Sequence, residues 1–121
     1  MPSRERIEGL IARVEAGQFV EALQEFYAED ATMQENLDPP RAGLANLVAH
    51  ERRVMASFKE TRASAIRPFF VEGDHVVINW VFEFTDPGGR MRRLDELAHQ
   101  RWRAERVCQE RFYYDPAALR R

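Results

Sequence analysis

The sequence predicts an α+β fold, with helices in the first sixty residues and an antiparallel sheet in the rest. Apolar residues recur every three or four positions up to Phe58 and at alternate positions from Ala63 onward. The two periodicities occupy separate parts of the chain, which is typical of α+β proteins. At 121 residues the chain is expected to be one domain, 1–121. A chain of this length buries about two thirds of its unfolded surface.

Three helices are expected before residue 60. The first follows Ser3, a residue type that caps helix N-termini, and ends before Gly17. The second begins near Phe19, and the third begins after Pro39–Pro40, because neither proline can donate a backbone hydrogen bond. Their apolar faces are formed in turn by Ile7, Leu10, Ile11 and Val14, by Val20, Leu23, Phe26 and Tyr27, and by Leu44, Leu47, Val48, Val54, Met55 and Phe58.

A short β-like segment, 31–35, lies between the second and third helices, and four antiparallel strands follow the third. Alternation predicts the first two of these over 63–71 and 75–85, with turns at 72–74 and 86–89. Pro68 indicates that the first of them is an edge strand or is bulged, since proline cannot donate to a sheet ladder. The segment 91–116 predicts two long strands joined by a tight turn at Ala104-Glu105-Arg106.

Charged and polar residues recur inside these last two strands, where a plain β-sandwich would have apolar ones. A long polar sheet of this kind usually curves around a binding site. With the helices as a covering layer, we expect a cone or half-barrel that encloses a partly polar pocket. This pattern predicts a site for a small-molecule ligand and does not identify a reaction.

Composition argues against several classes of partner. The net charge of −2 lacks the sustained basic surface that nucleic-acid binding needs, although arginines cluster late in the chain among acids. No stretch approaches the roughly 20 apolar residues of a membrane span, and the N-terminus has no apolar signal core. A single cysteine, Cys108, excludes an internal disulfide. An intracellular, cytoplasmic location is the simplest expectation.

Other chemistry has little support in the sequence. The three histidines, His50, His75 and His99, fall on a helix, a turn and a strand, so no metal site is expected. Cys108 has no adjacent base and is expected to be a buried small apolar residue. Gly88-Gly89 forms a hairpin turn and not a phosphate-binding loop. No cofactor is expected.

Two parts of the chain resemble a known family. The stretch Tyr27-Ala-Glu-Asp-Ala-Thr-Met-Gln-Glu35, followed by Pro39-Pro-Arg-Ala-Gly43 and a helix, resembles proteins like nuclear transport factor 2 (NTF2), the superfamily of ketosteroid isomerases and polyketide cyclases. The segments 94–102 and 110–116 look like the SnoaL-like branch of that superfamily in particular. The resemblance implies a cone-shaped α+β barrel, usually assembled as a homodimer through the sheet.

The resemblance also implies one catalytic residue and shows three departures. The general base of the isomerases lies eight residues after the tyrosine matched by Tyr27, a position that Glu35 occupies. The isomerases also use a tyrosine in the first helix, which has none here, and a protonated aspartate, whose position is Ala98. The aspartate of the polyketide cyclases falls at Phe112. Neither mechanism therefore carries over whole.

Pleat geometry supplies further candidates. If Ala98 faces inward, the same face carries Glu96, Gln100 and Trp102, and the other face carries Asp95, Leu97, His99 and Arg101. The matching set on the last strand is Glu110, Phe112 and Tyr114. The predicted catalytic group is then Glu35, Glu96 and Glu110, and the predicted ligand-binding residues are Tyr27, Trp80, Gln100, Trp102, Phe112 and Tyr114.

Alternatives remain open for several of these residues. Glu96 and Glu110 are equally compatible with ion pairs to arginines at the rim of the barrel, as is Asp95 with Arg93. Trp80, together with Phe82 and Phe84, fits a core stripe as well as a ligand-stacking wall.

Two functions are compatible with this sequence. One is a small enzyme of the isomerase, cyclase or dehydratase kind, which moves a proton next to a carbonyl of an apolar, ring-containing substrate with Glu35 as base. The other is a non-catalytic module that binds ligands or partner proteins. In either case Val77 and Val81 make the outer sheet face apolar, which predicts a homodimer through that face.

Overall fold

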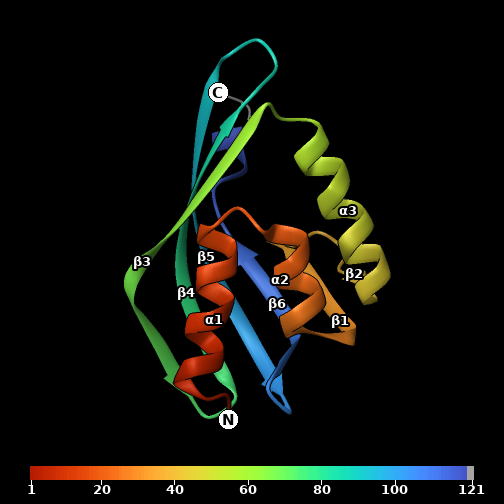
Figure 1. Ribbon diagram of the computed structural model, residues 1–121, viewed down its shortest axis with the longest axis vertical. Helices are drawn as coiled ribbons and strands as arrows, with labels where there is room; N and C mark the ends of the chain where they lie inside the picture. Colours follow the sequence, from red (N-terminus) through yellow and green to blue (C-terminus); the bar gives the residue numbers. More distant parts are fainter. Residues whose placement is uncertain (120–121) are drawn as a thin grey trace.

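The computed structural model describes residues 1–119 and confirms the α+β class. Three helices pack against one face of a six-stranded sheet, and a short 3₁₀ helix follows the last strand (Figure 1). The helices are α1 (Arg4–Glu15), α2 (Phe19–Phe26), α3 (Leu44–Ala56) and the 3₁₀ helix η1 (Pro116–Leu119). The strands are β1 (Tyr27–Glu35), β2 (Arg41–Ala42), β3 (Glu60–Glu72), β4 (His75–Thr85), β5 (Met91–Arg103) and β6 (Arg106–Tyr113).

The strand order in the sheet is β2-β1-β6-β5-β4-β3. Strand β1 runs parallel to β6, and the other neighbours are antiparallel. The sheet curves around the helices but does not close, because β2 and β3 are separate edges. Neither β2 nor the parallel pairing was predicted from the sequence. Both depend on contacts between segments that are far apart along the chain.

Strand β3 carries the irregularity expected at Pro68. The Arg67–Pro68 peptide bond is cis, and the pairing with β4 shifts register between Ile66 and Phe70. The strand also lies at the edge of the sheet, so both predicted features of this segment are confirmed. The β5–β6 turn is shorter than predicted, since Arg106 already belongs to β6. Ala104 and Glu105 have φ angles of 50° and 66°, as a two-residue type I′ hairpin turn requires.

Two helix ends differ from the prediction. Helix α2 ends at Phe26, and Tyr27 starts β1 with an extended backbone, φ −106° and ψ 146°. Tyr27 is buried here, as a residue on the apolar face of a helix would also be, so apolar spacing alone could not distinguish the two. Helix α3 ends at Ala56, and Phe58 lies beyond it with its ring 4.8 Å from that of Phe84. Three-residue spacing from Met55 made Phe58 look helical.

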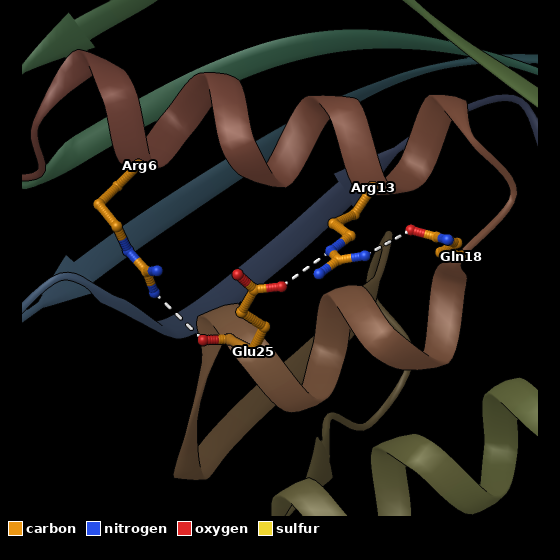
Figure 2. A network of polar contacts seen from close by, with 4 residues as sticks. All are labelled: Arg6, Arg13, Gln18 and Glu25. Atoms are coloured by element: carbon orange, nitrogen blue, oxygen red, sulfur yellow. Dashed lines mark hydrogen bonds and ion pairs between the residues drawn. The ribbon is translucent and has the colours of Figure 1, made fainter.

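Polar contacts connect α1 to α2 (Figure 2). Arg13 donates from Nε to the Glu25 carboxylate at 2.8 Å and from Nη1 to Gln18 Oε1 at 2.7 Å. Arg6 donates to the backbone oxygen of Glu25 at 3.1 Å. These contacts lie on the outer side of the helix pair, and the opposite side contributes Leu10, Val14, Phe19, Ala22 and Leu23 to the lining of a cavity over the sheet.

Residue alternation separates the two faces of the sheet as predicted. On β5, Glu96, Ala98, Gln100 and Trp102 are all buried, whereas Asp95 and Leu97 are exposed. On β4, Trp80 and Phe82 belong to the inner, aromatic face, and Glu83 pairs across strands with Arg62 and Arg93 on the outer face. The inner face therefore presents polar β5 side chains to the space under the helices.

Candidate functional site

A cavity of about 150 Å³ lies between the helices and the inner face of the sheet. Its walls are mostly apolar, and a ring of five aromatic side chains accounts for much of them. Phe82 is central to this ring, since its centroid lies 6.2 Å from Phe19, 6.2 Å from Trp80 and 5.8 Å from Phe84, against which it stacks. Phe112 completes the set from β6. Such flat apolar walls suit a planar or cyclic compound.

Four carboxyl groups face this cavity together with one guanidinium and one imidazole. The acids are Glu35, Glu51, Glu96 and Glu110, and the basic groups are Arg41 and His50. The acids come from four different elements, namely β1, α3 and the adjacent strands β5 and β6. Their surroundings differ, as the following contacts show.

Glu35 is the most accessible of the three predicted acids, with 31% of its side chain exposed. Its Oε2 lies 3.0 Å from Arg41 Nη1, and its Oε1 accepts a hydrogen bond from the Tyr114 hydroxyl at 3.2 Å. Burial, followed by the charge of Glu35, raises the pKa of Tyr114, so this hydroxyl keeps its proton. Glu35 is thus a carboxylate held by a cation and a neutral donor, with a second lone pair left on each oxygen.

Glu96 is only 6% exposed, and its carboxyl group has no hydrogen-bond or ion-pair partner among residues 1–119. Burial, followed by repulsion from Glu110, Glu35 and Glu51, raises the pKa of Glu96 to about 8. At neutral pH this group is therefore mainly an uncharged acid that can donate a hydrogen bond. The alternative of an arginine partner at the rim is not observed within the described part of the chain.

Glu110 is also buried, but both of its oxygens are occupied. The Tyr27 hydroxyl bonds Oε1, and Gln100 Nε2 donates to Oε2 at 2.7 Å. Burial raises the pKa of Glu110 to about 7, and the hydrogen bonds from Tyr27 and Gln100 oppose that rise. Trp102 Nε1 donates to Gln100 Oε1 at 3.0 Å and so extends the chain of contacts into the core.

Two residues of α3 that the sequence did not assign to the site also line the cavity. Burial raises the pKa of the half-buried Glu51, which Arg41 partly opposes. Burial and then Arg41 lower the pKa of His50. Glu51 follows Leu47 by four residues and precedes Val54 by three, so helical spacing was a usable signal for it.

Most of the residues predicted from the sequence converge here. The cavity lining includes Glu35, Glu96, Glu110, Tyr27, Trp80, Gln100 and Phe112. Trp102 and Tyr114 do not line it and instead contact Gln100 and Glu35. Ala98 is fully buried on the same face and brings no polar group to the position of the isomerase aspartate. Asp95, on the outer face, accepts a hydrogen bond from Asn79 at 2.7 Å.

Two further features bear on the kind of site. Within residues 1–119, no three His, Cys, Asp or Glu side chains are arranged to hold a metal ion. No helix in that part of the chain is long and apolar enough to cross a membrane.

Three solved structures show the same fold with a TM-score of 0.81 each. TerC, co-crystallised with polyporic acid, is 20% identical and aligns over 96% of this chain and 93% of its own. An NTF2-like protein of unknown function from Burkholderia pseudomallei K96243 is 16% identical, with coverage of 95% and 92%. A protein of ketosteroid isomerase-like fold from Catenulispora acidiphila DSM 44928, in complex with trimethylamine, is 19% identical, with coverage of 97% and 90%.

These identities establish the fold and not the activity. No curated protein sequence matches the chain. The sequence model of the SnoaL-like domain, however, matches residues 7–110, which include every acid of the cavity. The chain therefore belongs to the SnoaL-like domain family and has the NTF2-like fold.

Proposed function

We propose that this protein is a proton-transfer enzyme that acts next to a carbonyl group of a small, apolar, ring-containing compound. One observation carries the proposal: a single aromatic-walled cavity presents two carboxyl groups in contrasting surroundings. Glu35 forms an ion pair of 3.0 Å with Arg41, whereas Glu96 is buried without a partner and has a pKa of about 8. Environments that separate two carboxyl groups in this way assign one as base and the other as acid.

In this proposal Glu35 removes a proton from the carbon next to the carbonyl. The electron pair of the broken C–H bond forms the enolate, whose oxygen accepts a hydrogen bond from the neutral Glu96 carboxyl group. Glu35 then returns the proton to the same carbon or to one conjugated with it. Glu96 lies two residues before Ala98 on the same face, which displaces the acid by roughly 7 Å from the isomerase position.

The aromatic lining and the relatives support a small-molecule ligand. Two of the similar structures hold small molecules, polyporic acid in one and trimethylamine in the other. A cavity of about 150 Å³ has the size of one that binds benzene, so it is large enough for a compound with one ring.

Deuterium exchange tests the proposed reaction without knowledge of the natural substrate. In D₂O the wild-type protein should accelerate loss of the α-proton NMR signal of 1-indanone, relative to an equal concentration of Glu35→Gln. Glu21→Gln is the matched control, because Glu21 is an exposed acid on α2. The reaction proposed here is wrong if the wild type accelerates exchange in none of 1-indanone, acetophenone and 2-cyclohexenone.

A second candidate function is a non-catalytic binding module of the same fold. Both oxygens of Glu35 already accept contacts, and the two acids that the isomerases and cyclases use are replaced by Ala98 and Phe112. If the protein has this function, native mass spectrometry of the purified protein should detect a bound small molecule. None of the three ketones should then exchange its α-protons faster in the presence of the protein.

We further propose that the outer sheet face forms a homodimer. Ile66, Phe70, Leu97 and Tyr113 are exposed on it, the half-buried Val77 pairs with Phe70, and Val81 on the same face is buried. The helices cover only the opposite face. An apolar face of this extent is typical of an interface, which a two-fold pair buries. Sedimentation equilibrium at micromolar concentration should give about twice 14.2 kDa.

A matched pair of variants tests this interface. Leu97→Glu places a charge at the centre of the face and should yield the monomer. Leu37→Glu, at an apolar residue exposed in the loop before β2, should leave the dimer intact. A wild-type monomer, or equal behaviour of the two variants, would contradict this assembly.

A further inference from the structure

A chain of four buried side chains runs from the core to the cavity wall. Trp102 is followed by Gln100, Glu110 and Tyr27, none of them more than 5% exposed. The contacts are 3.0 Å from Trp102 Nε1 to Gln100 Oε1 and 2.7 Å from Gln100 Nε2 to Glu110 Oε2, and the Tyr27 hydroxyl bonds Glu110 Oε1. Three of the four, Gln100, Glu110 and Tyr27, also line the cavity.

The donors in this chain determine where each hydrogen lies. The indole N–H of Trp102 can only donate, so the Gln100 atom that it contacts must be the carbonyl oxygen. The amide nitrogen of Gln100 must then face Glu110, where it donates to Oε2 whether or not Glu110 is ionised. Only the contact between Oε1 and Tyr27 can reverse its direction.

That reversal changes what Tyr27 can do. When Glu110 is a carboxylate, the Tyr27 hydroxyl donates to it and has no hydrogen left for a ligand. When Glu110 carries a proton on Oε1, this buried donor requires an acceptor, and the Tyr27 oxygen is in contact with it. The hydroxyl hydrogen of Tyr27 must then point elsewhere, and Tyr27 lines the cavity.

We infer that Tyr27 recognises an acceptor oxygen of the ligand, such as a ketone oxygen, and that a proton on Glu110 releases the tyrosine hydroxyl for this contact. Gln100 and Trp102 are positioning residues: their hydrogen bonds orient the Glu110 carboxyl group so that its Oε1 faces Tyr27. The inference rests on the proposed function only in taking this cavity as the ligand site, and it assigns Tyr27 no part in removing the proton.

The expected pH window follows from the groups around Glu110. These are Tyr27 from β1, Glu96 and Gln100 from β5 and Glu51 from α3. Burial raises the pKa of Glu110 to about 7 and the pKa of Tyr27 above its usual value, so Glu110 is the member that titrates near neutrality. Ketone binding should therefore strengthen as the pH falls through about 7, with uptake of a proton.

Two isosteric probes, two variants and one control variant test this. Acetophenone has a carbonyl oxygen where α-methylstyrene has a CH₂ group, so their dissociation constants, measured by protein NMR, isolate the acceptor contact. From pH 8.5 to 6, the wild type should bind acetophenone roughly threefold to tenfold more tightly and α-methylstyrene unchanged. Glu110→Gln presents a fixed N–H to Tyr27 and should bind acetophenone tightly on both sides of pH 7. Tyr27→Phe should lose the change in acetophenone affinity whose midpoint is at about pH 7, and Tyr113→Phe, on the outer face, should keep it.

A second readout needs no ligand and no variant. In wild-type protein labelled with ¹³C, the Tyr27 Cζ signal should shift with the same midpoint as the Glu110 carboxyl signal. The inference is overturned if Tyr27 does not follow Glu110, or if acetophenone binds no better than α-methylstyrene at any pH. If the ketone exchanges its α-protons but the Tyr27 signal does not follow Glu110, the proposed reaction still holds and this inference does not. If the Tyr27 signal follows Glu110 but no ketone exchanges, the protein is a binding module.

Discussion

Glu35→Gln should slow α-proton exchange of 1-indanone by about 10²- to 10⁴-fold, the usual contribution of a general base. The amide keeps the shape of the side chain and can offer its one oxygen to Arg41 while its NH₂ group donates to the Tyr114 oxygen, but it cannot take a proton. The variant should therefore bind the ketone with nearly wild-type affinity. NMR measurement of exchange rates and dissociation constants on the same samples separates these two effects.

The control for this experiment is Glu21→Gln, which should exchange at the wild-type rate. If Glu35→Gln also exchanges at that rate, another acid is the base. Glu110, whose pKa is about 7, would then be the next group to replace, since a base works best with a pKa near the working pH. Loss of both exchange and binding in Glu35→Gln would instead mean that the Arg41 contact shapes the cavity.

Glu96→Gln should remove most of the loss of stability that the wild type shows in alkaline solution. The folded-state pKa of Glu96 lies at about 8, above its usual 4.5, so between these values the folded protein holds a proton that the unfolded chain has lost. The stabilisation that the proton on Glu96 contributes therefore falls as the pH rises through this window, and it is gone once the pH passes the folded-state pKa. At about 1.4 kcal/mol per pKa unit, the effect has an upper limit on the order of 5 kcal/mol.

Urea unfolding at pH 5.5, 7 and 9, at one fixed protein concentration, measures this dependence. The stability of the variant relative to the wild type should increase by several kcal/mol between pH 5.5 and pH 9, because its amide stays neutral. Glu110 contributes a similar but narrower dependence that ends near pH 7 and remains in the variant. If the free energy of unfolding depends on pH in the same way for wild type and Glu96→Gln, the pKa of Glu96 is not raised by folding. Glu96 could then not be the neutral acid of the proposed reaction.

Local chemistry along the chain was enough to place the main elements and the polar face of the sheet. The change of apolar period separated helices from strands, and Pro68 marked the irregular edge strand, because proline cannot donate to a ladder whatever the fold. Alternation put Glu96, Gln100 and Trp102 on the inner face, since a pleated strand directs every second side chain to one side. Family resemblance, rather than periodicity, singled out Glu35.

Tertiary packing decided the rest. Tyr27 belongs to a strand because β6, some eighty residues later, offers it a parallel partner, and Glu51 reaches the site because α3 lies over the cavity. The same packing leaves Glu96 alone, gives Glu110 two donors and pairs Glu35 with Arg41. Identical glutamates thereby have different surroundings, which raise the pKa of Glu96 to about 8 and that of Glu110 to about 7, because the pKa of a carboxyl group depends on the water, charges and donors around it in space.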